Sequence, residues 1–323
     1  MKVTVIMPVF NAEKYISDAI DSLLAQSNEE WKLICIDDGS TDRSLKIIEN
    51  YLIQDKRIEL IRQENTGPGV ARAKAIQVAN TEYVSILDSD DAYPTDYIEK
   101  MLLKAEQTRA DIIVPDVAFG YGNTKKIPNI FISNKLSPDM VINNGEEAFA
   151  LTFPWKLHGW IMIKTSLAKK YYTPNKLQYS KYNSDEYITR LLYLKSSKTV
   201  LCDAEYQYRI APDSITRKPS LKKLDYFKTL DILIDLCQEE NINDSILLNI
   251  YNDYYISIIN MTRMVNNLPI EEQKKGKAII KNIYYSSYKA KFNKRILSKA
   301  TLKTKAKFYI SMHSFLFFKL ISR

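Results

Sequence analysis

The first part of the chain alternates between short apolar runs and longer segments in which apolar residues recur at helical spacing. The run VTVIMPV (3–9) is apolar or β-branched throughout, which is typical of a parallel strand buried on both faces. From Ile16 to Leu24, apolar residues recur three and four positions apart. This predicts an amphipathic helix, with Asn11 before it as the N-cap. The predicted building unit is therefore a strand followed by a helix.

The same unit repeats as far as residue 115. Further strands are predicted over 31–37, 57–62, 82–88 and 111–115, and further helices from Thr41, over 70–79 and over 95–108. This alternation indicates an α/β fold, a mostly parallel, Rossmann-like sheet with helices on both faces. In such sheets ligands bind at the carboxyl ends of the strands.

The pattern becomes less regular after residue 115 and helical near the end. Residues 120–155 are mixed, and they precede a predicted strand over 160–163, a helix from Ser184 to Lys195, and strands near 199–202 and 206–210. From Leu221 onward apolar residues recur at helical spacing. We therefore expect an α/β domain over 1–217 and a helical C-terminal region over 218–323.

Two of the predicted strands end in carboxylates. Asp37 and Asp38 close the second strand, and Asp88, Asp90 and Asp91 follow the fourth. Parallel strands place both clusters at one edge of the sheet, where like charges raise one another's pKa. A hard divalent cation between them fits, and so do the hydroxyl groups of a sugar or ribose. The alternative is a plain acidic turn, because Asp is favoured in turns and N-caps.

The composition narrows the possible kinds of protein and of metal site. Of the 323 residues, 46% are hydrophobic, enough for one large domain with an appendage or for two domains. Only two histidines are present, so a metal site has to rest on carboxylates. Cys35, Cys202 and Cys237 have no metal or redox spacing, which predicts reduced, buried thiols in a cytosolic protein. No stretch approaches the roughly 18 apolar residues of a membrane span, and the first residues form a predicted strand, not a signal peptide.

Two classes of nucleotide-binding enzyme are excluded because their motifs are missing. A dinucleotide-dependent oxidoreductase needs GxGxxG after the first strand, where this chain has PVFNAE. A P-loop enzyme needs GxxxxGK followed by Ser or Thr, which the sequence lacks. The acidic edge therefore belongs to another class of protein.

Four segments of the N-terminal half, in this order and spacing, resemble a family 2 glycosyltransferase of the GT-A fold. They are VTVIMPVFNAEKYISDAIDSLLAQS, KLICIDDGSTDRSLKII, ENTGPGVARAKAI and YVSILDSDD. A later segment, YNSDEYITRLLYLKSSKTVLCDAEYQYRIAPDSIT, resembles the second half of the family, so the resemblance covers about residues 1–217. It implies a catalytic domain with a nucleotide-binding half (1–115) and an acceptor-binding half (116–217).

The resemblance also implies how a nucleotide is held. Pro8 and Phe10 would line the nucleobase pocket, and Asp38 would accept a hydrogen bond from the base, as from N3–H of uracil. Gly67 would let its loop approach the ligand. Arg72 would lie near the base or the diphosphate.

The acidic turn receives two roles from the same resemblance. Asp88 would hold the ribose, and Asp90 would bind a Mn²⁺ or Mg²⁺ ion that bridges the diphosphate of the donor, with Asp91 as support. Such a metal is a Lewis acid that offsets the charge building up on the departing diphosphate.

Attack by a sugar hydroxyl also requires a general base. In the resembling family this is an Asp that opens a helix, usually written Glu-Asp. Here Asp185 keeps that place, and Ser184 replaces the usual Glu but can still cap the helix. A base opposite the leaving group implies inversion at the anomeric carbon. His158 and Trp160 would bind the acceptor; the alternative is that both are structural.

The chain carries a net charge of +8, and its basic residues are concentrated at the end. From Lys274 to Arg323 there are fourteen Lys and Arg residues and no Asp or Glu. Three interpretations compete: a basic amphipathic helix on an anionic membrane, a nucleic-acid contact, or a solvated helical face. We favour the membrane, because no nucleic-acid recognition motif is evident.

The predicted function is an inverting, metal-dependent transfer of one hexosyl or N-acetylhexosaminyl group from a nucleotide-sugar, expected to be UDP-linked, to a saccharide acceptor. The acceptor would be a lipid-linked capsule or O-antigen intermediate, met at the inner face of the cytoplasmic membrane. The QxxRW motif of processive synthases is absent, so one sugar is expected per encounter. The alternatives are a non-catalytic nucleotide-sugar-binding protein and a metal-dependent nucleotidyltransferase. The sequence makes no prediction of oligomeric state.

Overall fold

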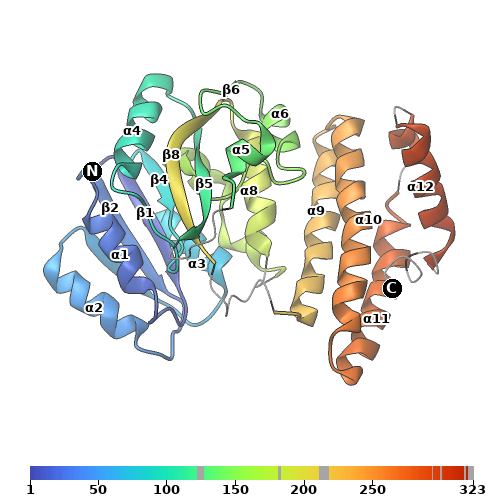
Figure 1. Ribbon diagram of the computed structural model, residues 1–323, viewed down its shortest axis with the longest axis horizontal. Helices are drawn as coiled ribbons and strands as arrows, with labels where there is room; N and C mark the ends of the chain where they lie inside the picture. The colour runs from blue at the N-terminus through green and yellow to red at the C-terminus, as the bar shows by residue number, and fades with distance from the viewer. Residues whose placement is uncertain are drawn as a thin grey trace. The chain divides into compact units, whose positions relative to one another are not determined.

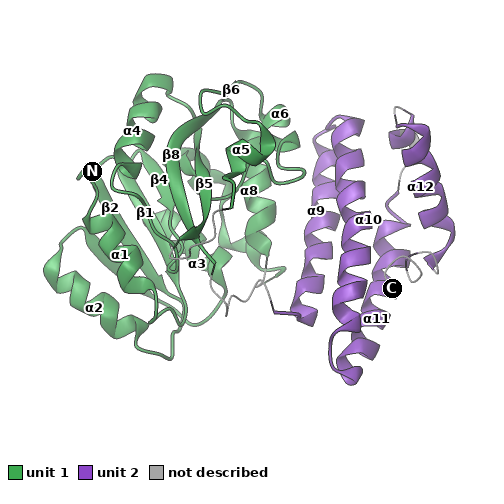
Figure 2. Ribbon diagram, in the orientation of Figure 1, with its two compact units in different colours: residues 1–212 green, residues 213–323 purple. Residues whose placement is uncertain are grey.

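The computed structural model describes residues 1–121, 127–180, 183–210, 218–292, 294–298, 300–315 and 318. It divides into two compact units, residues 1–212 and residues 213–323 (Figure 2). The predicted domain boundary after residue 217, the APDSIT part of the resembling segment, Tyr182 and most of the last eight residues lie outside the described residues.

Within the described residues, the first unit is built on one sheet of eight strands in the order β3-β2-β1-β4-β7-β5-β8-β6. The strands are β1 (Val3–Val9), β2 (Trp31–Asp37), β3 (Ile58–Arg62), β4 (Tyr83–Ile86), β5 (Ile112–Tyr121), β6 (Val141–Ile142), β7 (Met162–Lys164) and β8 (Thr199–Arg209). The pairs β1–β2, β1–β4, β2–β3 and β5–β8 are parallel, and β6 and β7 join antiparallel. The predicted mostly parallel sheet is confirmed.

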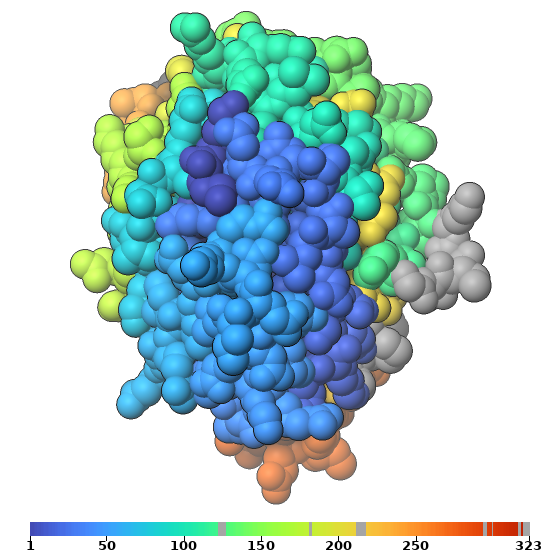
Figure 3. Space-filling model, turned by 90° about the vertical axis from the view of Figure 1, so that its left-hand side faces the viewer, coloured from blue at the N-terminus to red at the C-terminus, as the bar shows by residue number. Residues whose placement is uncertain are grey.

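Helices cover both faces of this sheet (Figure 1). They are α1 (Ile16–Leu24), α2 (Ser44–Gln54), α3 (Pro68–Val78), α4 (Tyr97–Thr108), α5 (Ile130–Asn134), α6 (Gly145–Ala150), α7 (Thr165–Tyr171) and α8 (Ser184–Lys195). Apolar residues of α1 and α4 share one core with alternate residues of β1, while α3 contacts β1 and β2 and packs with α7 and α8. All of β1 is buried, as expected of a strand covered on both faces. Figure 3 views the side on which α1 and α2 lie, where the N-terminal segments (blue) make up most of the surface.

The structure corrects the predicted N-cap of α1. Asn11 has a left-handed backbone with φ of 51°, and α1 begins only at Ile16, with Tyr15 at the cap position. Asn is among the residues that tolerate this conformation. Its Oδ1 instead accepts a hydrogen bond of 2.8 Å from the Thr41 N–H. Asn11 therefore joins the loop after β1 to the loop after β2.

Regular structure also extends beyond the predictions. The segment 120–155 contains α5, β6 and α6, and Asn144 caps α6 by accepting hydrogen bonds from two backbone N–H groups. The strands predicted near 199–202 and 206–210 form the single strand β8, which shifts register against β5 after Val114. These elements are short or bulged, so they show little periodicity in the sequence.

The second unit is helical, as predicted. Its described elements include α9 (Tyr226–Glu239), α10 (Asp244–Asn266), α11 (Ile270–Ile283), the π-helical segment η3 (Tyr284–Tyr288) and α12 (Leu302–His313). Its core is rich in buried tyrosines whose hydroxyl groups find partners; Tyr284, for example, donates to the Ser311 carbonyl at 2.8 Å. Within the described helices of the chain, none combines the length and apolar character needed to cross a membrane. Cys35, Cys202 and Cys237 are buried free thiols.

Candidate functional site

The acidic clusters lie at one edge of the sheet, as predicted. In the sheet β1 lies between β2 and β4 and is parallel to both. The carboxyl ends of β2 and β4 therefore point the same way. Asp37 is the last residue of β2, Asp38 follows it, and Asp88, Asp90 and Asp91 form the turn after β4.

The end of β8 holds this acidic turn. Asp91 is 1% exposed, and its carboxylate accepts hydrogen bonds of 2.7 Å from the Tyr206 hydroxyl and from the Arg209 N–H. The Tyr206 hydroxyl in turn accepts a hydrogen bond of 3.1 Å from the Asp88 N–H, and the Arg209 guanidinium donates to the Asp90 carbonyl at 2.8 Å. Burial and the charges of Asp88 and Asp90 raise the pKa of Asp91 to about 8. Asp91 thus supports the turn from inside.

Arg72 joins two residues that the sequence assigned to different roles. Its guanidinium contacts the carboxylates of Asp88 and Asp185, each at 2.6 Å. Burial lowers the pKa of Arg72, but the charges of its carboxylate partners outweigh that effect and hold it well above its ordinary value. The predicted ribose-binding carboxylate and the predicted general base, 97 positions apart by their residue numbers, are therefore joined by one side chain.

Asp90 differs from its neighbours. Apart from its own backbone N–H, no described residue donates a hydrogen bond to its carboxylate, whereas the carboxylates of Asp88 and Asp91 are held by donors from other residues. Burial, followed by the charge of Asp88, raises its pKa to about 6. A bound cation would offset both effects, so the residue fits the predicted metal ligand. Within the described residues no three His, Cys, Asp or Glu side chains are grouped so as to hold a metal ion by themselves.

Asp38 fixes the loop before α3. It is 2% exposed and accepts hydrogen bonds from Gln63 Nε2 at 2.7 Å and from the N–H groups of Thr66 and Gly67 at 2.9 Å. Gly67 has φ of 95°, a conformation that favours glycine. The predicted contact between Asp38 and a nucleobase stays a prediction, and the observed bonds show that its carboxylate also shapes the loop.

The two other predicted nucleobase contacts lie at the end of β1. Pro8 is buried within the strand, and Phe10, just beyond it, is 45% exposed. An exposed phenyl ring beside the carboxyl edge is available for a ligand. Both assignments stay predictions.

Of the two predicted acceptor residues, His158 is buried and Trp160 is half-buried. His158 is 3% exposed, its Nε2 bonds to the Pro115 carbonyl at 2.9 Å, and burial lowers its pKa to about 4. Trp160 stacks on Tyr206 with ring centroids 5.2 Å apart and donates from Nε1 to Asp88 at 3.0 Å. Trp160 is therefore tied to the carboxylate that is predicted to bind the ribose. An acceptor contact by either residue stays a prediction.

The N-terminal turn of α8 packs closely on α3. Asn183 occupies the N-cap position, and Ser184, the expected cap, is the first residue of the helix. A Cβ atom added at Gly69 would lie 2.9 Å from Ser184 Oγ, so the two helices meet where Gly69 leaves room. Nearly two turns into α8, the guanidinium of the fully buried Arg190 contacts the rings of Phe153 and Trp155, at 4.3 and 4.1 Å from their centroids. This packing fixes the helix that carries Asp185.

Sequence reasoning missed Tyr206 and the bond from Trp160 to Asp88. The available signal for Tyr206 was the alternation of Tyr206 and Tyr208 in a predicted strand, which places both rings on one face. That pattern does not reveal that the face meets an acidic turn more than a hundred residues earlier.

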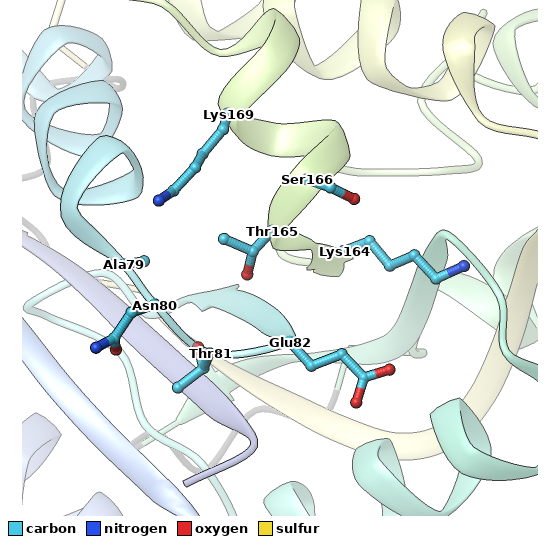
Figure 4. A pocket seen from close by; sticks show the side chains of 8 residues that line it. All are labelled: Ala79, Asn80, Thr81, Glu82, Lys164, Thr165, Ser166 and Lys169. Atoms are coloured by element: carbon cyan, nitrogen blue, oxygen red, sulfur yellow. The ribbon is translucent and has the colours of Figure 1, made fainter.

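A pocket of about 400 Å³ lies away from this site (Figure 4). Residues 79–82, which precede β4, line it together with Lys164 of β7 and residues of α7; Thr165 lies in the middle of the view, and the Lys169 side chain points from α7 toward Ala79. The carboxylates follow the other end of β4, so this pocket has no part in the acidic site.

Comparisons with known proteins agree with this geometry. Residues 4–159 match the family described as Glycosyl transferase family 2. These residues form a glycosyltransferase family 2 segment. The chain that carries this family 2 segment has the GT-A fold: over 97% of its length it superposes on 54% of TarS of Staphylococcus aureus, with a TM-score of 0.69 and 22% sequence identity.

Bacterial relatives are similar to this chain at the sequence level. Glycosyltransferase GlyA of Streptococcus pneumoniae serotype 4 is 29% identical over 74% of the chain and 34% of that protein. Poly(ribitol-phosphate) beta-glucosyltransferase of Bacillus spizizenii is 31% identical over 66% of the chain and 33% of that protein. The chain thus matches only about a third of the length of these curated relatives.

Proposed function

We propose that this protein transfers a single sugar, with inversion, from a UDP-linked nucleotide-sugar to a saccharide acceptor of a bacterial surface glycan. The observation that carries the proposal is the Arg72 bridge, because it brings a nucleotide-side carboxylate and a base-side carboxylate into one site. Further support comes from relatives: TarS is described in complex with UDP-GlcNAc, and the B. spizizenii relative is named a glucosyltransferase. Those names support a hexosyl or N-acetylhexosaminyl donor.

The donor would lie along the carboxyl edge of the sheet. Asp88 would bind the ribose hydroxyl groups while Arg72 and Trp160 hold its carboxylate in place. The loop fixed by Asp38 would approach the nucleotide through Gly67, where no side chain intervenes. Hydrogen bonds within the protein hold these groups in place, which would reduce the entropic cost of binding.

A divalent cation, Mn²⁺ or Mg²⁺, would be held by Asp90. The single carboxylate suits Mg²⁺-type sites, in which one or two carboxylates and the phosphates of the substrate share the ion. When bound, the ion supplies charge stabilisation to the departing diphosphate.

Asp185 would act as the general base. Its carboxylate would take the proton of the acceptor hydroxyl as that oxygen bonds to the anomeric carbon and the nucleoside diphosphate leaves from the opposite face. The bond to Arg72 fixes the orientation of the carboxylate relative to Asp88. A single displacement of this kind inverts the anomeric carbon.

The acceptor would be a lipid-linked intermediate, met at the cytoplasmic face of the membrane, as in the synthesis of capsule or O-antigen. The fifty C-terminal residues support this, because they contain basic residues and no acidic ones. The B. spizizenii relative is named for poly(ribitol-phosphate), which makes a polymer of that kind a second candidate acceptor.

Calorimetric titration of UDP, GDP and CMP, with and without Mn²⁺, tests the donor site. We expect UDP to bind best and to need Mn²⁺, and Asp90→Ala to weaken that binding at least about tenfold. Asp139→Ala is the matched control, because Asp139 is an exposed aspartate on the surface that pairs with Lys104. Equal binding of UDP and GDP, or no effect of Mn²⁺, would contradict the proposal.

A further inference from the structure

Helix α12 carries apolar residues on two opposite sides. One side is packed: Phe308 stacks on Phe292 at 5.4 Å, and Ser311 bonds to both Tyr284 and Tyr288 of η3. Phe308, Ser311 and Met312 are all buried. This side accounts for how α12 attaches to its unit.

The other side of α12 is exposed although it is also apolar. Leu302 is 84% exposed, Tyr309 66% and Ile310 46%, and Ala306 lies between them on the same face. By the 3.6-residue repeat these positions lie opposite Phe308. An exposed stripe of apolar side chains marks an interaction surface, so this face calls for a partner. In Figure 1, α12 stands at the end of the row of helices in its unit, farthest from α9.

The charge around this face indicates the chemistry of that partner. Lys303 lies at one margin of the exposed stripe and Lys305 at the other, while further exposed lysines lie on the preceding elements: Lys274, Lys275, Lys277, Lys281 and Lys289. The sequence has no Asp or Glu after residue 273. The partner is therefore anionic and also accepts aliphatic and aromatic side chains.

We propose that the outer face of α12 (Leu302, Ala306, Tyr309 and Ile310) binds an anionic phospholipid surface. The apolar side chains would enter the interface, and the flanking lysines would stay at the level of the headgroups. The phosphates of a nucleic acid could pair with the lysines, but they would not bury the apolar side chains of Leu302 and Ile310. A second copy of the chain would bring two basic faces together, and like charges oppose that contact. The proposal rests on the proposed function, because it names the surface that would bring the enzyme to a lipid-linked acceptor.

Sedimentation with lipid vesicles tests the proposal on the full chain. We expect binding to phosphatidylcholine vesicles that contain phosphatidylglycerol, little binding to phosphatidylcholine alone, and weaker binding as salt is raised. The variant with Leu302→Ser, Tyr309→Ser and Ile310→Ser should bind these vesicles on the order of tenfold more weakly. Ile53→Ser is the matched control, because Ile53 is 87% exposed on α2 of the other unit.

Further measurements keep the outcome decisive. The circular dichroism of the triple variant should match the wild type, which shows that it folds. Vesicle binding equal to the wild type would overturn the proposal. So would poly(U) binding in place of vesicle binding, or a wild-type dimer in light scattering that the variant loses. UDP titration of the wild-type protein separates the two proposals. A wild type that binds vesicles but does not bind UDP would contradict only the proposed function.

Discussion

Arg72 is the residue on which the two halves of the candidate site depend. Its guanidinium has a planar, forked geometry that reaches two carboxylates at once, which the point charge of a lysine cannot match. It binds Asp88 on one side and Asp185 on the other, both at 2.6 Å. Replacing Arg72 by lysine should therefore alter the geometry of the site while the net charge stays the same.

We expect Arg72→Lys to lower the turnover rate, measured as UDP formed from the best-binding UDP-sugar, by about 100-fold. A displacement of about 1 Å in a reacting group has effects of that size. UDP affinity should fall much less than in Asp90→Ala. Steady-state kinetics and calorimetry on the same preparations measure both. Arg43→Lys is the control, because Arg43 pairs with Glu13 on the surface. Wild-type turnover in Arg72→Lys would refute the bridging role.

At the scale of elements, β8 does more than extend the sheet. Its last residues hold the turn after β4, with Tyr206 bonding to both Asp88 and Asp91 and packing under Trp160. Arg209 adds bonds to the same turn and to Asp18 of α1. The acidic turn is thus fixed by a strand that follows it by more than a hundred residues.

Tyr206→Phe keeps the ring but removes the hydroxyl group that serves two partners. Asp91 then loses a buried hydrogen bond and the Asp88 N–H a partly buried one, which should lower the free energy of unfolding by about 1–3 kcal/mol. Urea denaturation measures this, and Mn²⁺-dependent UDP affinity should fall with it. Tyr309→Phe, at an exposed position, should change neither quantity. If both variants behave alike, the turn does not depend on β8.

At the scale of the whole molecule, the carboxylate cluster makes stability depend on pH. Burial and neighbouring charges raise the pKa of Asp91 to about 8, against about 4 in an unfolded chain. Over this range the folded protein binds more protons than the unfolded chain, so the free energy of unfolding falls as pH rises. The loss is complete only above the folded pKa. The lowered pKa of His158 acts in the opposite direction, but only below about pH 7.

We therefore expect the metal-free protein to lose about 1 kcal/mol of stability between about pH 7 and pH 8 through Asp91. Urea denaturation in EDTA at the two pH values measures the change. Asp91→Asn should lose this part of the slope, while contributions shared by both proteins, such as those of the cysteines, cancel in the comparison. An identical slope in the two proteins would show that Asp91 is already ionised at neutral pH.

The sequence predicted what depends on short-range pattern. Continuous apolar runs located the central strands, and the parallel order then placed Asp38 and Asp88 at one edge without further information. The Arg72–Asp185 and Tyr206–Asp91 contacts were not predictable in this way, because each joins segments more than a hundred residues apart. The prediction of Asn11 as an N-cap was wrong, because its side chain instead accepts a hydrogen bond from the loop after β2. The pattern therefore gives the scaffold, whereas the pairing within the site comes from tertiary packing.

The burial of all three cysteines has a practical consequence. Burial raises the pKa of Cys35 to about 12 and that of Cys202 to about 11, and Cys237 is only 2% exposed. The thiolate is the reactive form, so thiol reagents should leave the folded protein almost untouched. A single cysteine introduced on the surface, for example at the outer face of α12, would then be the one rapidly labelled position. Fluorescent or spin labels could thus be attached without first removing the native cysteines.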